Sequence, residues 1–422
     1  MMALEQLYKY PLKLAKLRSG PLCDTLGGFC DALLEEGFRP STIRKHLGCI
    51  SHLNEYLDSR RDFTGQPLTE QILREFLRDY PAKARVRGSL DEHIRCMKWS
   101  LNRFARYLRA SGRFEEPVNA MTEQPLLGAY LRWLKEYQGA APGTIDLRAR
   151  HVSQFLQWLG PQATPQDCSE LTPATVEGFF LNYAKHKGRS SQRSMQAALR
   201  TFLRFCLQQG YIQQPLGWAV PRLCGYQLST VARGLSEEQA QELLRSIDRG
   251  TPAGRRDYAI CQLLYTYGVR GGQVRALRLQ DIDWAGNQIL FRALKHGKDS
   301  LLPLTQEVGE SLLDYLQNAR PCFPEPRLFL TLRPPYHGLD SSGVVSSIIA
   351  RHVQVAGFDI AHKGAHIFRH GFATRMLAQG HSLKAIADVL GHRHLGSTAI
   401  YTKVDFHQLE QVALPWPGEV AS

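Results

Sequence analysis

The chain has 422 residues, which is room for about two to four domains with sizeable hydrophobic cores. Its hydrophobic content is 43% and its charged content 22%, values ordinary for a globular protein, and no apolar run approaches the ~20 residues that a membrane span requires. Lys and Arg outnumber Asp and Glu by 52 to 39, an excess that favours a polyanionic partner such as nucleic acid, although a generally basic enzyme is equally consistent with it.

The cysteines and the N-terminus indicate the cellular compartment. The nine cysteines are scattered and no two are spaced as Cys-x-x-Cys, which argues against both a zinc ribbon and a disulfide framework. Free thiols fit a reducing cytoplasm. Residues 1–20 have no continuous apolar core, so they do not form a signal peptide. We therefore expect a cytoplasmic protein without a membrane partner, with residues 1–20 as a short N-terminal segment.

The N-terminal half is predicted to be helical and to contain the same domain twice, at 21–115 and at 122–220. Near Thr42 and near Thr144, a Pro and a Thr-Ile pair precede apolar residues at helical spacing, which is a signal for a helix start. The last helical run of each copy is followed by a Gly, where a left-handed residue is favoured. Because the sequence identity between the copies is weak, helical patterning alone is the alternative explanation.

A basic segment lies between the third and fourth apolar runs of each copy. Basic residues mixed with small hydroxyl side chains suit contacts to DNA phosphates. The alternative is a solvated surface, which is the commoner role of a single charged run, although the same placement in both copies favours DNA. The predicted DNA-binding residues are Lys83, Arg85 and Arg87 in the first copy and Lys185, Lys187, Arg189 and Arg193 in the second.

Residues 221–235 show little periodicity and are predicted to be a linker to a different domain, 236–422. Ser236 and Gln239 have the spacing of a capping box before an amphipathic helix. Two further helical runs are followed by three short apolar segments with Gly-containing turns, which predict an antiparallel β-meander. The remainder, to about residue 414, is predicted to be helical. The expected fold class is mainly α with a small antiparallel β-meander.

The stretch 366–405 contains an unusual set of polar residues. His366 and Arg369 are three residues apart and share one face of a helix. Gly380 and Gly391 each follow a helical run and are predicted to be C-terminal caps. The set is completed by Arg270 at a junction of two helices, Lys295 at the end of the second strand, His392 directly after a cap, and Tyr401 nine residues further on.

These residue types fit a phosphodiester better than a metal ion. Arg binds two phosphate oxygens at once, Tyr can be a covalent nucleophile, and His and Lys can transfer protons. The set has no carboxylate cluster to hold Mg²⁺. His362, His366 and His370 have the spacing of a metal-binding helix face, but Arg369 would repel a cation and no acidic or Cys partner is near. We therefore expect neither a metal nor a cofactor.

The same residues resemble the catalytic signature of the tyrosine recombinase (phage integrase) family. The shared pattern is His-x-x-Arg-His, then Leu-Gly-His, then Ser-Thr and a Tyr nine residues after the His. Tyr-Gly-Val-Arg followed by ALRLQDIDW is similar to the family's first-arginine box, and LKHGKDSLLPL is similar to its β-hairpin lysine box. The boxes keep the family's order through 236–405, nearly half of the chain. The helical repeats resemble, more weakly, the family's core-binding domain.

The resemblance implies that Arg270 and Arg369 clamp the scissile phosphate. It further implies that Tyr401 forms a 3′-phosphotyrosyl bond with the cut strand. That bond keeps the energy of the phosphodiester, so religation to a new strand needs neither ATP nor a metal.

The resemblance assigns proton transfer and hydrogen bonding to three more residues. His366 would exchange a proton with the nucleophile and hydrogen-bond the phosphate, and His392 would hydrogen-bond a non-bridging oxygen. Lys295 would protonate the leaving 5′ oxygen. Lys298 is the alternative for this last role, and Lys295 is favoured because its spacing from the LLPL segment fits the family better.

The chain departs from the family at Gln273, where many members carry an acidic residue three positions after the first arginine. The departure leaves the orientation of Arg270 open. The predicted function is an active site-specific recombinase or integrase, which the complete six-residue set favours. The alternatives are a DNA-binding or architectural relative without catalysis, and an enzyme that relaxes supercoils as a topoisomerase does.

The expected partner is double-stranded DNA at specific recombination sites. Strand exchange between two duplexes needs four active sites, so the expected assembly is a homotetramer on two DNA sites, alone or with related recombinases. The tail, residues 407–422, has four apolar residues at helical spacing before two prolines. It would either link neighbouring protomers, as in the family, or fold back on its own domain.

Overall fold

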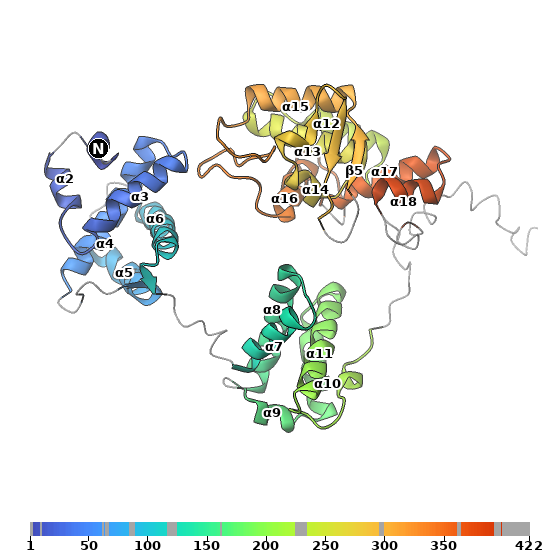
Figure 1. Ribbon diagram of the computed structural model, residues 1–422, viewed down its shortest axis with the longest axis horizontal. Helices are drawn as coiled ribbons and strands as arrows, with labels where there is room; N and C mark the ends of the chain where they lie inside the picture. The colour runs from blue at the N-terminus through green and yellow to red at the C-terminus, as the bar shows by residue number, and fades with distance from the viewer. Residues whose placement is uncertain are drawn as a thin grey trace, which may run out of the picture. The chain divides into compact units, whose positions relative to one another are not determined.

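Figure 1 shows the protein as a computed structural model. It describes residues 3–8, 11–60, 63, 67–83, 89–115, 125–160, 163–223, 234–294, 299–360, 364–391 and 398. The chain divides into two compact units, which are 1–9, 27–45 and 227–422 for the first and 10–26 and 46–226 for the second. Among the described residues, no helix is both long and apolar enough to cross a bilayer. The sequence predicts a different division into domains, and this division stays a prediction. Its segments are 21–115, 122–220, the linker 221–235 and 236–422.

The N-terminal part of the chain is built of helices. Their bounds are α1 (Ala3–Leu7), α2 (Pro11–Leu17), α3 (Cys23–Glu35), α4 (Pro40–Asp58), α5 (Glu70–Lys83) and α6 (Leu90–Ala110). The short strands β1 (Leu68–Thr69) and β2 (Phe114–Glu115) pair in parallel, and so they join the chain before α5 to the chain after α6.

Residues 125–223 form a helical bundle with its own core. Its elements are α7 (Pro125–Glu136), α8 (Pro142–Leu159), α9 (Pro165–Ser169), α10 (Pro173–Lys185), α11 (Arg189–Gln208) and the 3₁₀ turn η1 (Gly217–Ala219). The first four helices begin at a proline, whose missing N–H costs nothing in a first turn. In the core, the rings of Tyr130 and Phe155 pack against Phe202, with centroid distances of 5.3 and 6.0 Å.

The last helices of the two predicted copies bury the same pattern of side chains. The buried apolar positions follow the same spacing in α6 and α11, and these are Met97, Leu101, Phe104, Ala105 and Leu108 against Met195, Leu199, Phe202, Leu203 and Cys206. The predicted glycines after both helices, Gly112 and Gly210, are left-handed, with φ of 68° and 72°. The duplication itself stays a prediction, and the shared spacing supports it.

Residues 234–391 contain the predicted β-meander among helices. The elements are α12 (Glu237–Ser246), α13 (Pro252–Tyr267), α14 (Gly271–Ala276), η2 (Leu279–Asp281), β3 (Ile282–Asp283), β4 (Gln288–Phe291), β5 (Ser300–Pro303), α15 (Gln306–Asn318), α16 (Ser342–Val355), α17 (His366–Ala378) and α18 (Leu383–Leu390). The strands pair antiparallel in the order β3-β4-β5, with Ile282 opposite Ile289 and Leu290 opposite Leu301. The mainly α class with a small antiparallel meander is therefore confirmed.

The predicted capping box before α12 is present. Ser236 Oγ accepts from the N–H of Gln239 at 3.2 Å, and Gln239 Oε1 accepts from the N–H of Ser236 at 3.1 Å. The predicted caps Gly380 and Gly391 are left-handed, with φ of 81° and 62°.

Two expectations about this part were wrong. The second strand was expected to reach Lys295, but β4 ends at Phe291 and the N–H of Ala293 donates instead to the side chain of Asp299, at 2.7 Å. Residues 319–341 were expected to be helical and are not. Five prolines in this segment explain the difference, because each lacks the N–H that a helix interior needs.

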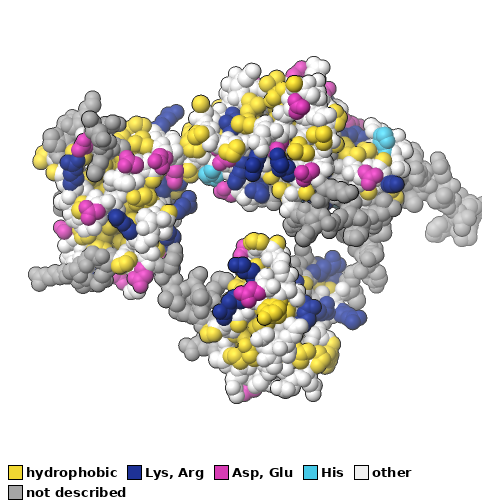
Figure 2. Space-filling view, viewed as in Figure 1, with side chains coloured by type: hydrophobic (Ala, Val, Ile, Leu, Met, Phe, Trp, Pro, Cys, Tyr) yellow, Lys and Arg dark blue, Asp and Glu magenta, His cyan; other side chains and the backbone are white. Residues whose placement is uncertain are grey.

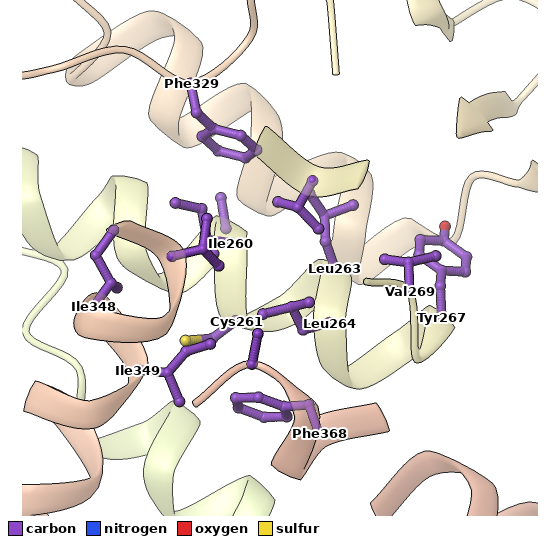
Figure 3. Close-up of a cluster of buried hydrophobic side chains, with 14 of the residues drawn as sticks. Ile260, Cys261, Leu263, Leu264, Tyr267, Val269, Phe329, Ile348, Ile349 and Phe368 are labelled. Carbon is purple, nitrogen blue, oxygen red and sulfur yellow. The ribbon is translucent and has the colours of Figure 1, made fainter. Parts of the chain in front are cut away.

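Helix α13 lies at the centre of the C-terminal core, as Figure 3 shows. Ile260, Leu263 and Leu264 have no exposed surface. Phe329 from the proline-rich segment and Phe368 from α17 pack in the same cluster. Since α13 is covered from several sides, the elements around it share one core.

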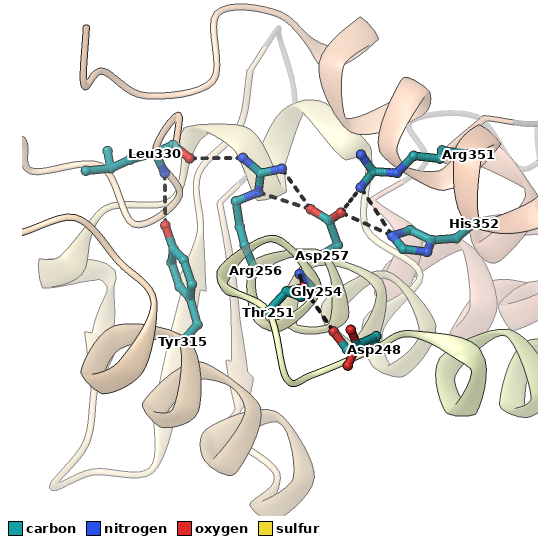
Figure 4. Close-up of polar contacts among 9 residues, drawn as sticks. All are labelled: Asp248, Thr251, Gly254, Arg256, Asp257, Tyr315, Leu330, Arg351 and His352. Carbon is teal, nitrogen blue, oxygen red and sulfur yellow. Dashed lines mark hydrogen bonds and ion pairs between the residues drawn. The ribbon is translucent and has the colours of Figure 1, made fainter. Parts of the chain in front are cut away.

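A buried carboxylate fastens α13 to its neighbours (Figure 4). Asp257 is fully buried and pairs with Arg256 at 2.9 Å, with His352 at 3.1 Å and with Arg351. Burial raises the pKa of the Asp257 carboxyl, but the hydrogen bond from His352 and the charges of both arginines outweigh it, so the pKa lies below its ordinary value. Arg256 also donates to the carbonyl of Leu330, at 3.3 Å.

Two glycines allow the chain to enter this domain directly against α17. The N–H of Leu235 donates to the carbonyl of Ile367 at 3.3 Å. A Cβ on Gly371 would lie 2.6 Å from the carbonyl oxygen of Leu235, and a Cβ on Gly234 would lie 2.2 Å from the nitrogen of Gly371. Side chains at these two positions would therefore push the two backbone segments apart.

Gly371→Ala should lower the free energy of unfolding by about 1–3 kcal/mol, because backbone atoms must move to accept the methyl group. Chemical denaturation of the full chain measures this change. Gly309→Ala is the matched control: Gly309 also lies inside a helix, but its nearest neighbour would be a Leu304 side chain at 3.9 Å. The control should be neutral or stabilising by roughly 0.5–1 kcal/mol, as helix propensity predicts. Equal stabilities for the two variants would contradict the close approach of the two backbones.

Candidate active site

Arg369 lies in the first turn of α17 and its side chain is buried, with 4% of the residue exposed. Its Nη1 donates to the carbonyl of Gly268 at 3.0 Å, and its Nη2 donates to the carbonyl of Leu390 at 2.8 Å. These carbonyls belong to the C-terminal ends of α13 and α18, where helix carbonyls have no partner within the helix. The guanidinium therefore bridges two helix ends.

Arg270 lies between α13 and α14, at the helix–helix junction that the sequence predicts, and its side chain is exposed. Its backbone N–H donates to Oε1 of Gln273 at 3.1 Å, and Gln273 is buried. An amide oxygen thus caps α14 as a carboxylate oxygen would. The departure at Gln273 removes a negative charge from this position but keeps the capping hydrogen bond, a role that the three-residue spacing could have suggested.

His366 is the first residue of α17 and is exposed. Partial burial lowers the pKa of its imidazole, and the positive charges of Arg369 and Arg270 lower it further. The ring therefore favours its neutral form, which can accept a proton. A Cβ on Gly271 would lie 2.9 Å from the Cβ of Ala365, so the turn that carries Arg270 packs against the residue that precedes His366.

The remaining predicted catalytic residues, Lys295, His392 and Tyr401, lie outside the described residues. The same is true of Lys298, the alternative proton donor, of His362, part of the histidine spacing considered for a metal, and of the tail 407–422.

Only one of the predicted basic residues of the first copy can be placed. Arg85 and Arg87 lie outside the described residues, and Lys83 is the last residue of α5. In the second copy, Lys185 ends α10, Lys187 lies in the connection, and Arg189 begins α11. The basic segment of the second copy is therefore a helix–helix corner rather than a long loop.

The corner between α10 and α11 is basic, exposed and held in shape. All four of its predicted DNA-binding residues, Lys185, Lys187, Arg189 and Arg193, are exposed. Figure 2 shows Lys and Arg side chains gathered over the α11 side of this bundle. The amide of Gln192 donates to the carbonyls of Ala184 and Lys187, at 2.9 and 2.7 Å. This arrangement suits a polyanion such as a DNA backbone.

Comparison with known proteins agrees with the residue pattern. The model of the phage integrase family matches residues 233–408. The relative named "Putative integrase/recombinase y4rF" from Sinorhizobium fredii is 30% identical over 99% of this chain and 97% of its own length. Tyrosine recombinase XerC of Oceanobacillus iheyensis is 29% identical over 68% of this chain and 93% of its own length.

Solved structures share the fold. The XerH site-specific recombinase in a post-cleavage complex with its difH substrate matches with a TM-score of 0.54 and 18% identity, covering 80% of this chain and 93% of that one. A lambda integrase dimer bound to a core site matches with a TM-score of 0.52 and 18% identity, covering 66% and 94%. Together with the full-length relative, these findings show that the chain belongs to the phage integrase family of tyrosine recombinases.

Proposed function

We propose that this site-specific recombinase cuts and rejoins double-stranded DNA through a 3′-phosphotyrosyl intermediate, with Tyr401 as the nucleophile. The observation that carries the proposal is that the turn of Arg270 packs against the start of α17, the helix that carries His366 and Arg369. Two guanidinium groups beside a neutral imidazole suit a phosphodiester, whose negative charge increases in the transition state. An architectural relative without catalysis has no need of this combination.

In the proposed reaction the Tyr401 oxygen attacks phosphorus and the bond to the 5′ oxygen breaks. The tyrosine proton passes to His366, and Lys295 gives a proton to the departing oxygen. One phosphodiester replaces another, so the reverse attack by a 5′ hydroxyl reseals DNA without ATP. Lys298 remains the alternative donor.

The other residues bind and hold the phosphate. Arg270 and Arg369 stabilise its developing charge, and His392 donates a hydrogen bond to a non-bridging oxygen. No metal and no cofactor enter this scheme.

The proposed partner is DNA at specific sites, bound by both helical repeats and by the catalytic domain. The named structures of XerH and lambda integrase are complexes with DNA, which supports this partner. We further propose a homotetramer on two sites, alone or with related recombinases, in which the tail 407–422 either links neighbouring protomers or folds back on its own domain. We also propose that the protein acts in the cytoplasm.

On a nicked suicide substrate that traps the cut strand, the full chain should form a covalent DNA adduct in EDTA without Mg²⁺. Tyr401→Phe should bind the same DNA with unchanged affinity and form no adduct, because it lacks the attacking oxygen. Denaturing gel electrophoresis measures the adduct. Loss of the adduct on chelation would contradict the metal-free reaction, and an adduct on the Phe variant would assign another nucleophile. Relaxation of plasmids lacking the site would favour the topoisomerase alternative.

Arg270→Ala should raise the pKa of His366, because a positive charge that lowers it is removed. The wild-type imidazole is neutral above its lowered pKa, so cleavage should be lost as pH falls through that value, and the loss should begin at higher pH in the variant. NMR titration of ¹³C-labelled histidine and the pH dependence of adduct formation measure the two effects. Arg204→Ala, in the α7–α11 bundle, should leave both unchanged. An unshifted His366 in Arg270→Ala would rule out the coupling.

Changing Lys185, Lys187, Arg189 and Arg193 together to Gln should reduce the dependence of DNA affinity on salt. The plot of log K against log[salt] has a negative slope, and each DNA phosphate that is no longer neutralised makes this slope less steep by about 0.9. Fluorescence anisotropy of the full chain on its site at several salt concentrations measures the slope. Arg132→Gln with Lys135→Gln, two exposed changes on α7, is the control and should keep the wild-type slope. A quadruple variant with the wild-type slope would make the corner a solvated surface only.

A further inference from the structure

The two carbonyls that Arg369 holds lie directly before two turns of the predicted active site. Gly268 and Leu390 are far apart in the sequence, yet one buried guanidinium donates to both, at 3.0 and 2.8 Å. We propose that Arg369 is a positioning residue that keeps these two turns in register, in addition to its proposed contact with phosphate. This inference rests on the proposed function, since the register matters only if the turns carry catalytic residues.

The first turn leads from α13 to Arg270. Gly268 is left-handed, with φ of 59°, and its N–H donates to the carbonyl of Leu264 at 3.0 Å. A Cβ at this position would lie 2.6 Å from the ring of Phe372, so α17 packs directly on the turn. Arg270 follows two residues later, with its own N–H held by Gln273. The Arg369 bond to Gly268 therefore fixes where Arg270 leaves the helix end.

The second turn ends α18 in the same way. Leu390 is the last residue of the helix, and Gly391 is left-handed with its N–H directed to the carbonyls of Ala387 and Asp388. In the sequence, the next residue is His392. Both turns are thus glycine caps, and in both a predicted catalytic residue follows closely in the chain.

The chemistry of a guanidinium explains why arginine suits this place. Carbonyls at a helix C-terminus have no partner in the helix and carry partial negative charge. A planar guanidinium presents several N–H donors in a fixed fork, so it can join two carbonyls from different helices in one geometry, whereas the lysine ammonium is a compact charge on a flexible stem. Loss of Arg369 should therefore loosen both turns as well as remove a charge. Loss of Arg270, whose side chain is exposed, should remove only a charge.

A neutral substrate separates these two effects. In a methylphosphonate suicide substrate, a methyl group replaces one non-bridging oxygen of the scissile phosphate, so the transition state carries less negative charge and needs less cationic help. Adduct formation by the full-length wild type, Arg270→Ala and Arg369→Ala is measured on this substrate and on ordinary phosphate. On phosphate, each alanine variant should lose roughly 10²–10³-fold in rate.

The methylphosphonate should rescue Arg270→Ala to near the wild-type rate on the same substrate. Arg369→Ala should stay about 10²-fold slower, the order of cost expected when reacting groups are misplaced by about an ångström. In Arg369→Ala, amide hydrogen exchange at Gly268 and Gly391 should also accelerate, and in Arg270→Ala it should not. Equal rescue of the two variants would overturn the proposal, and so would unchanged exchange at both glycines.

Two further variants keep the test decisive. If circular dichroism shows that Arg369→Ala does not fold, the same comparison is made between Arg369→Lys and Arg270→Lys, which keep the charge but not the fork. Arg369→Lys should still resist rescue and show faster exchange, whereas normal exchange with full rescue would overturn the proposal. Tyr401→Phe in the same series tests the function separately, because an adduct formed without Tyr401 rejects the nucleophile and leaves the role of Arg369 to the exchange measurement.

Discussion

The C-terminal domain depends on the burial of α13, a helix whose side chains are covered from several sides. A charged side chain on a buried helix needs partners that replace water, and the Asp257 carboxylate has them in Arg256, Arg351 and His352. The same burial makes the position of the helix end precise, since the core fixes it along its length. The cap Gly268 and then Arg270 follow directly after the buried part of α13. Packing of the core against α13 therefore determines where Arg270 begins.

The candidate site combines buried and exposed arginines with different surroundings. Arg369 is enclosed and bonded to backbone carbonyls, while Arg270 reaches the surface from a capped turn. Partial burial and the charges of both arginines lower the pKa of His366, which suits a group that accepts a proton.

Local features were predictable from the sequence and tertiary ones were not. The spacing of His366 and Arg369 indicated a shared helix, and Gly391 indicated the cap of α18, because both signals lie within a few residues. The carbonyl partners of Arg369 carry no side-chain signal, so no pattern could indicate them. The five prolines of residues 319–341 are a local signal against a helix, and the expectation of a helix there overlooked them. The close approach of Gly234 to Gly371 depends on two segments that are distant in the chain.

That glycine pair gives the molecule a mechanical property. The chain enters the domain with Leu235 bonded to Ile367, on the helix that carries both His366 and Arg369. A pull on the chain ahead of residue 234 would therefore be transmitted to α17 through this hydrogen bond, and to the core through the buried side chain of Leu235. Without a side chain at either glycine there is no compressible layer between the two backbones to absorb the strain. Tension in the polypeptide ahead of residue 234 would thus change the positions of His366 and Arg369, which lie in the first turn of α17.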